Sequence, residues 1–198
     1  PVSLKAVVDF ISNPAGKFKD DDGESHSFFA ARQLLIPVDK AAVIKNGILP
    51  ASDSTLIQDT IQLNLPQGKR VLTKTEMIIL DMLANYKWER PIYFGQMGGD
   101  LEIGIKDYLE FDGFAYKFVP IKSSTTLGNP GRIASDKLYN LLMNVYKWGN
   151  IDKPETNVDY QHLITFSAVM PVRNIFTLTA KGLMANGKNK EAVEILDK

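Results

Sequence analysis

The segment Phe94–Asp100, with the sequence FGQMGGD, follows an apolar run that predicts a short buried strand over residues 91–95. In open α/β sheets, ligands bind beyond the carboxyl ends of strands, and glycines there let backbone amides approach an anion. This reasoning gives the candidate ligand-binding residues Arg90, Tyr93, Gly95, Gly98 and Asp100. The glycine spacing differs from that of a dinucleotide-binding loop. We therefore expect a plain turn and keep a ligand loop as the alternative.

The tripeptide Tyr-Lys-Trp occurs at residues 86–88 and again at residues 146–148, each time at the end of a predicted helix. An aromatic ring at a helix end can stack on a sugar ring, so Lys147 and Trp148 join the candidate ligand-binding residues. Aromatic side chains also seal the edge of a core, and lysine is favourable at the negative end of a helix. Packing is the expected role.

Other residue patterns predict no catalytic residue, no metal site and no cofactor. The sequence lacks the patterns of zinc peptidases, of serine hydrolases and of nucleotide-binding loops. The acidic stretch of residues 19–24 lacks the calcium-loop spacing, and His26 and His162 have no metal-ligand companion nearby. Cysteine is absent, which excludes thiolate sites and disulfides.

Length and charge further narrow the class of protein to which the chain can belong. A chain of 198 residues fits one domain with a small appendage. Lysine plus arginine and aspartate plus glutamate both number 23, so no uncompensated basic surface is expected for nucleic acid. No apolar stretch is long enough to cross a bilayer. Both ends have the character of cut ends, which suggests a piece of a longer protein.

Periodicity predicts an α+β (or α/β) fold: a small mixed sheet of about four short strands packed with helices. Strands are expected over residues 33–39, 59–66, 91–95 and 114–121. Helices are expected over residues 4–12, 39–46, 74–88, 105–113 and 135–148. The predicted caps are Ser3, Asp39, the Thr73–Glu76 capping box and Ser135. Gly47 is expected in a left-handed conformation after the second helix. Residues 13–26 are expected to form an exposed loop.

The C-terminal residues predict two short helices separated by a Gly-Lys turn, similar to a tetratricopeptide-type hairpin. A new helix is expected to begin near Pro171, because proline is tolerated in a first turn. Val193 and Leu196, with Ile195 beside them, are expected to pack on the preceding helix, at Phe176, Leu178 and Leu183. The predicted division is an α/β body at residues 1–158 and a helical segment at residues 159–198.

Five sequence blocks carry a resemblance to a known family. They are LLIPVDKAAVIKNGILP, EMIILDMLANYKWERPIYFG, DYLEFDGFAYKFVPI, LYNLLMNVYKWGN and PVRNIFTLTAKGLMANGKNKEAVEILDK, and they cover most of residues 30–198. Together they resemble the C-terminal soluble region of a family of Bacteroidetes multi-spanning membrane proteins. The membrane part of that family is similar to GT-C glycosyltransferases, the class that includes protein O-mannosyltransferases. The matching residues whose charged, polar or aromatic side chains could take part in binding or catalysis are Asp39, Lys40, Arg90, Tyr93, Lys147, Trp148, Arg173 and Asn174.

The resemblance implies a position on the periplasmic side of the cytoplasmic membrane, as part of a larger protein that carries any transferase chemistry elsewhere. Contact with the membrane is expected only through a preceding segment. We predict a non-catalytic accessory domain that binds an acceptor protein or a partner subunit, with a glycan as a possible ligand. The alternative is a domain that binds or processes a sugar or nucleotide sugar at the end of the strand at residues 91–95.

Overall fold

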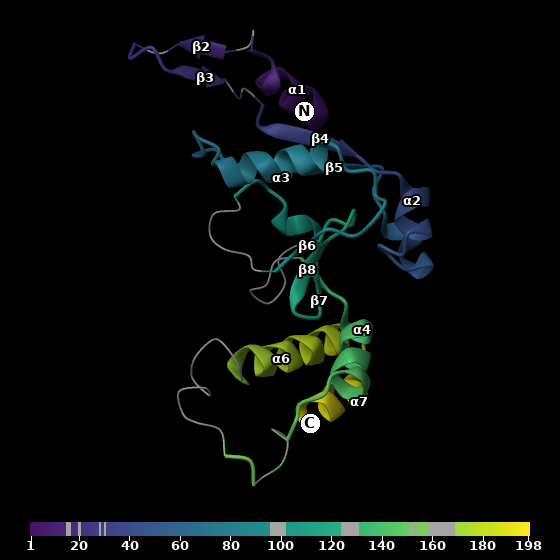
Figure 1. Ribbon diagram of the computed structural model, residues 1–198. Coiled ribbons are helices and arrows are strands. Elements are labelled where there is room, and N and C mark those ends of the chain that lie inside the picture. The colour runs from purple at the N-terminus through teal and green to yellow at the C-terminus, as the bar shows by residue number, and fades with distance from the viewer. Residues whose placement is uncertain are drawn as a thin grey trace. The chain divides into compact units, whose positions relative to one another are not determined.

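The computed structural model describes residues 1–14, 17–19, 21–27, 29, 31–95, 102–123, 131–150, 153, 155–157 and 169–198. The chain forms two compact units (Figure 1). Unit 1 contains Pro1–Leu109 and Lys117–Gly131, and unit 2 contains Glu110–Tyr116 and Arg132–Lys198. The predicted boundary at residues 158 and 159 lies outside the described residues and stays a prediction.

A three-stranded sheet organises the N-terminal part of unit 1. Its order is β1 (Val2–Ser3), β4 (Gln33–Pro37) and β5 (Thr60–Asn64), with β1 parallel and β5 antiparallel to β4. Both β4 and β5 bury alternate residues, as the period-two pattern predicts for a half-buried strand. Helix α1 (Leu4–Ser12) buries Leu4, Val7 and Val8 and contacts α3 (Lys74–Ala84). Sequence periodicity predicted α1, β4 and β5 but not the short strand β1.

The predicted loop at residues 13–26 contains secondary structure, which corrects the sequence-based expectation. Strands β2 (Lys17–Lys19) and β3 (Ser25–Ser27) form an antiparallel ribbon in which Phe18 pairs with His26. Gly23 takes a positive φ of 79° between them. The strands are too short and too polar to produce a recognisable alternation, so glycine and aspartate content dominated the prediction.

Two of the predicted helix caps agree with their sequence signatures, and two are wrong. Ser3 makes no side-chain cap hydrogen bond at the start of α1, and the helix that begins at Ser135 has Ala134, not Ser135, as its N-cap residue. In α2 (Lys40–Lys45), the Asp39 carboxylate accepts a hydrogen bond from Ala42 N at 2.9 Å. Gly47 follows this helix with φ at 66°, as predicted. In α3, Thr73 and Glu76 form the predicted reciprocal capping box. A 3₁₀ helix, η2 (Ala51–Leu56), lies between α2 and β5.

Helix α3 ends at Ala84, earlier than the predicted end near residue 88. The Asn85 side chain ends the helix by donating to Asp81 O at 2.9 Å. Trp88 has a positive φ of 58°, which an α-helix does not allow, and its side chain is buried. Its indole stacks on Phe118 with ring centroids 5.9 Å apart. The first Tyr-Lys-Trp tripeptide thus seals a core.

A four-stranded sheet has the order β6-β8-β7-β9, and the chain passes between the two units within β7 and β8. The strands are β6 (Tyr93–Phe94), β7 (Leu109–Asp112), β8 (Ala115–Phe118) and β9 (Arg132–Ile133). The helix predicted at residues 105–113 is wrong: a 3₁₀ turn, η3 (Lys106–Tyr108), leads directly into β7. All four β7 residues are buried, although their sequence alternates apolar and acidic side chains.

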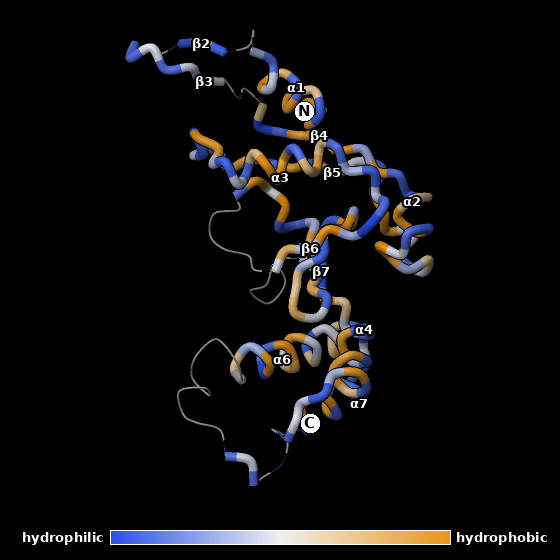
Figure 2. Tube along the Cα trace, in the orientation of Figure 1, coloured by the Kyte–Doolittle hydropathy of each residue, from blue (hydrophilic) through white to orange (hydrophobic). Residues whose placement is uncertain are grey.

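Unit 2 is built from helices around its own core. They are α4 (Ser135–Asn140), the π-helical turn η4 (Leu141–Val145), α6 (Val169–Ala185) and α7 (Asn189–Leu196). Its core consists of Phe111, Leu138, Leu142, Ile175, Ala180, Leu183, Ala192 and Ile195. Pro171 lies in the first turn of α6, where its missing N–H costs no helical hydrogen bond. Figure 2 shows hydrophobic and hydrophilic residues alternating along α6 and α7.

The C-terminal hairpin of α6 and α7 is confirmed, and so is the burial of Ile195, but two of the predicted contact residues of α7 are wrong. Ala192 and Ile195 are buried, whereas Val193 and Leu196 are 59% and 57% exposed. Two side-chain hydrogen bonds join the C-terminal hairpin to α4. Tyr139 Oη donates to Glu194, and Lys188 Nζ donates to Asp136. The buried face of α7 is therefore that of Ala192 and Ile195.

The α+β class is thus confirmed, with the strands distributed over three small sheets among the described residues. Within the described part of the chain, no helix combines the length and the apolar character needed to cross a bilayer.

Candidate functional site

The residues predicted around the strand at residues 91–95 lie in unit 1, and the structure describes three of them. Arg90, Tyr93 and Gly95 are exposed, and Tyr93 is 47% exposed rather than buried. The backbone oxygen of Arg90 accepts a hydrogen bond from Tyr86 Oη at 2.8 Å. Gly98 and Asp100 lie outside the described residues. The ligand loop at this strand end therefore stays a prediction.

A small pocket in unit 1 has a volume of about 220 Å³ and a mixed polar lining. Its described lining residues are Asn64, Pro66, Glu102, Gly104, Lys106 and Asp107. Gly104 has φ at 80°, and a Cβ there would lie 2.6 Å from both Asn64 N and Asn64 O. The pocket floor is therefore two backbone segments in close contact. None of the predicted ligand-binding residues is among these lining residues.

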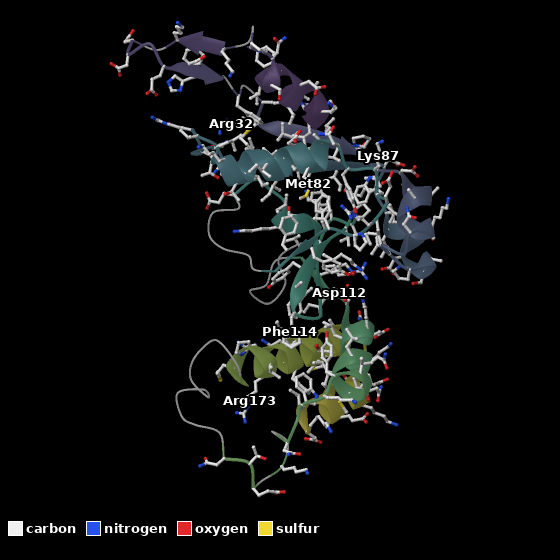
Figure 3. All side chains as sticks on the ribbon, viewed as in Figure 1. Arg32, Met82, Lys87, Asp112, Phe114 and Arg173 are labelled. Carbon is white, nitrogen blue, oxygen red and sulfur yellow. The ribbon has the colours of Figure 1, made fainter. Side chains whose placement is uncertain are left out.

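Unit 2 brings the second Tyr-Lys-Trp tripeptide into a row of four aromatic rings, which we call the aromatic row. Phe114 contacts Tyr146 with ring centroids 5.5 Å apart, and Tyr146 contacts Trp148 edge-on at 5.8 Å. Trp148 in turn contacts Phe176 of α6 at 5.3 Å. Phe114 is 51% exposed at the turn between β7 and β8 (Figure 3). The row thus runs from a strand turn to a helix.

The π-helical turn η4 positions the centre of the aromatic row. Its wider winding ends the helix at Val145, and Tyr146 N donates to Leu141 O at 2.7 Å. Trp148 Nε1 then donates to Leu142 O at 3.0 Å. A π turn inside a helix is rare and often occurs at functional sites. Here it fixes both aromatic rings against the core of unit 2.

The chemistry of the aromatic row favours apolar contact over directional hydrogen bonding. Tyr146, Trp148 and Phe176 are partly buried, and one side of each ring packs against the unit 2 core. Trp148 has a single N–H donor, and Leu142 O already accepts it. Lys147 is exposed beside the row, and the exposed Arg173 precedes Phe176 by one helical turn. Rigid aromatic rings with a neighbouring arginine are typical of protein-binding surfaces.

The buried carboxylates among the described residues are held in ion pairs. Glu110 Oε2 lies 2.9 Å from Arg132 Nε, and Asp112 Oδ2 lies 2.8 Å from Lys137 Nζ. In unit 1, Glu76 Oε1 lies 2.7 Å from Lys69 Nζ. No cluster of three or more metal-ligating side chains occurs among the described residues.

The pKa shifts likewise have structural causes. Burial alone would raise the pKa of Glu76, but Lys69 and the Thr73 cap outweigh it and hold the pKa below its ordinary value. Burial raises the pKa of Tyr86 to about 12. A hydrogen bond to Glu194 raises the pKa of Tyr139. None of these shifts brings a pKa closer to 7, the range in which a side chain transfers protons efficiently at neutral pH.

Sequence reasoning found Trp148 and Lys147 but missed Phe114, Tyr146 and Phe176 as members of one surface. Phe114 follows an Asp-Gly pair, which signals a turn and hence an exposed aromatic residue. That local signal was available in the sequence. The contact between residues 148 and 176 has no comparable local signature.

The fold and these surfaces define an α+β domain with a C-terminal helical hairpin. A protein-family model described as TMEM260-associated domain 2 matches residues 1–137. The match covers more than half of the chain, and the chain belongs to this family. TMEM260 is a membrane protein family, so the domain is associated with a membrane protein. No curated protein sequence and no solved structure matches the chain.

Proposed function

We propose that this chain is a non-catalytic interaction domain of a membrane glycosyltransferase-like protein. It binds an acceptor protein or a partner subunit on the periplasmic side of the cytoplasmic membrane. Membership in the TMEM260-associated family supports the link to a membrane protein. The glycosyltransferase character and the periplasmic side rest on the resemblance of the five sequence blocks.

The observation that carries the binding function is the aromatic row. Phe114 leaves about half of its surface in water although it contacts Tyr146, and the neighbouring rings are fixed on the core. Such rings lose little side-chain entropy when a partner covers them, so their contact area contributes efficiently to affinity. The π turn and the Trp148 hydrogen bond provide this rigidity before any partner binds.

A glycan ligand is the second candidate, because aromatic rings also stack on sugar rings. A sugar additionally needs polar groups that fix its orientation. The Trp148 N–H is engaged by Leu142 O, and Lys147 is the exposed polar residue between the two central rings. Because so few polar groups are left to orient a sugar, we rank protein binding above glycan binding.

The test is capture of partners from an envelope extract with the wild-type chain and a Phe114→Ala variant, followed by mass spectrometry. Interface residues of the hot-spot type contribute about 2 kcal/mol or more, so the variant should bind its partner roughly 30-fold more weakly. Phe18→Ala is the matched control, because Phe18 is also 51% exposed and also contacts one aromatic ring, that of His26. The control should bind like the wild type.

The captured protein must then be purified and bind the chain directly, with Phe114→Ala weaker and Phe18→Ala unchanged. Equal recovery by all three chains would contradict a role of the aromatic row. Calorimetry with a glycan panel separates the second candidate: glycan binding lost in Phe114→Ala, without any partner protein, would make the domain a glycan-binding module.

A further inference from the structure

The segment of residues 66–74, which we call the KRVL loop, connects β5 to α3 and has an unusual surface. It contains Lys69, Arg70 and Lys74 around Val71. Val71 is 77% exposed, more than any other large hydrophobic side chain among the exposed ones in the described chain. Figure 2 shows hydrophobic residues between hydrophilic ones where the chain enters α3. An apolar tip surrounded by cations needs a physical explanation.

The KRVL loop is held in place at both ends. Arg32, labelled in Figure 3, donates from Nη1 to Pro66 O at 2.9 Å and to Lys69 O at 2.6 Å. Lys69 Nζ also pairs with the buried Glu76, whose carboxylate caps α3 by accepting from Thr73 N at 2.9 Å. These contacts fix the chain on both sides of Val71, whose side chain is exposed.

The loop also concentrates charge of one sign in a chain whose net charge is zero. Arg32, Lys69, Arg70 and Lys74 carry four positive charges, and the single acidic residue within positions 65–80 is the buried Glu76. An excess of three positive charges therefore remains. Lys74 is the first residue of α3, where the positive end of the helix dipole disfavours a cation. Helix stability thus does not account for Lys74.

We propose that the KRVL loop docks on an anionic lipid surface. Arg70 and Lys74 contact the headgroup phosphates, and Val71 enters the interface between headgroups and acyl chains. Cations that flank exposed apolar residues are the combination that binds peripheral segments to acidic membranes. This contact is separate from partner binding by the aromatic row, since it uses unit 1 residues alone. It also adds a membrane contact beyond the preceding segment expected from the sequence.

The experiment is co-sedimentation of the chain with vesicles of phosphatidylcholine mixed with phosphatidylglycerol and with vesicles of phosphatidylcholine alone, at low and high salt. We expect binding to the mixed vesicles that high salt weakens. Each cation near an anionic surface contributes ~1 kcal/mol, so Arg70→Gln with Lys74→Gln should lower the partition coefficient about 30-fold. Val71→Ser should lower it several-fold, because the apolar contact is lost.

The matched control is Lys190→Gln with Val193→Ser, which removes an exposed lysine and an exposed valine from α7. This variant should bind the mixed vesicles like the wild type, and thermal unfolding should show that every variant is folded. Absence of binding to the mixed vesicles, equal binding to both vesicle types, or equal losses in the control would overturn the proposal. So would unchanged binding after Val71→Ser, or binding to heparin without vesicle binding, which would indicate an acidic macromolecule instead.

Discussion

The Glu76 carboxylate is fully buried, yet it stays ionised because three groups compensate its loss of water. Lys69 Nζ lies 2.7 Å from Oε1, and the Thr73 N–H and hydroxyl both donate to Oε2. Removing one partner of a buried pair leaves the other partner uncompensated. A single residue thus links the cap of α3 to the KRVL loop.

Glu76→Gln should lower the free energy of unfolding at pH 7 by about 1.5–3 kcal/mol, the range for a hydrogen bond to a charged group. The pKa of Glu76 is lowered in the folded chain, so its stabilising effect is present above the ordinary value of 4.5. The effect is lost as the pH falls through the folded pKa. The stability difference between wild type and variant should therefore shrink on acidification.

Urea unfolding of the wild type and of Glu76→Gln, at pH 7 and at acidic pH, measures this difference in the free energy of unfolding. Asp59→Asn is the control, because Asp59 pairs with Lys40 at 3.0 Å while its side chain is 92% exposed. Exposed pairs contribute about 0–1 kcal/mol, so this variant should change little. A pH-independent effect of Glu76→Gln would show that packing, rather than charge, accounts for the loss.

At the scale of elements, the correction in α7 gives a direct test of which face packs. Ile195 is fully buried in the unit 2 core, and Val193 is 59% exposed. Ile195→Ala should lower the free energy of unfolding of unit 2 by about 2–5 kcal/mol, whereas Val193→Ala should change it by less than about 0.5 kcal/mol. Calorimetry or denaturant unfolding of the two variants provides the comparison. A larger effect of Val193→Ala would restore the packing predicted from sequence.

The elements that were predictable from sequence are those whose signals lie within a few residues. Asp39, the Thr73–Glu76 box and Gly47 act on neighbours at most four positions away, so composition and spacing revealed them. The conformation after α3 was not predictable, because Asn46 Nδ2 donates to the Trp88 carbonyl oxygen at 2.8 Å across 42 positions. The candidate site shows the same division. Trp148 was found from its tripeptide, whereas its contact with Phe176 depends on tertiary packing.

The strand β7 shows a second limit of sequence reasoning. Its four residues, Leu109–Asp112, alternate apolar and acidic side chains, but all are buried. Glu110 and Asp112 are buried because Arg132 and Lys137 neutralise them. A pattern based on hydrophobicity cannot distinguish a paired buried carboxylate from a solvated one, so the segment resembled a polar helix.

At the scale of the whole molecule, the chain has two compact units, and unit 2 contains a core cluster formed entirely by its own residues. Unit 1 has separate buried side chains in α1, β4, β5 and α3, among them Leu4, Leu34, Ile61 and Leu80. Domains with their own cores can unfold in separate transitions. We therefore predict two calorimetric transitions for the 198-residue chain.

Two variants assign these transitions. Gly104→Ala should lower the one that belongs to unit 1, because the residue has φ at 80° and its Cβ would lie 2.6 Å from the Asn64 backbone. Gly47→Ala is the control for backbone strain alone: φ is 66°, but nothing lies within 4 Å of its Cβ. Gly47→Ala should lower the free energy of unfolding by about 1–2 kcal/mol, and Gly104→Ala should lower it by more. Ile195→Ala should lower the other transition and leave the first in place. A single transition that all three variants shift together would show that β7 and β8, through which the chain passes between the units, couple them into one cooperative fold.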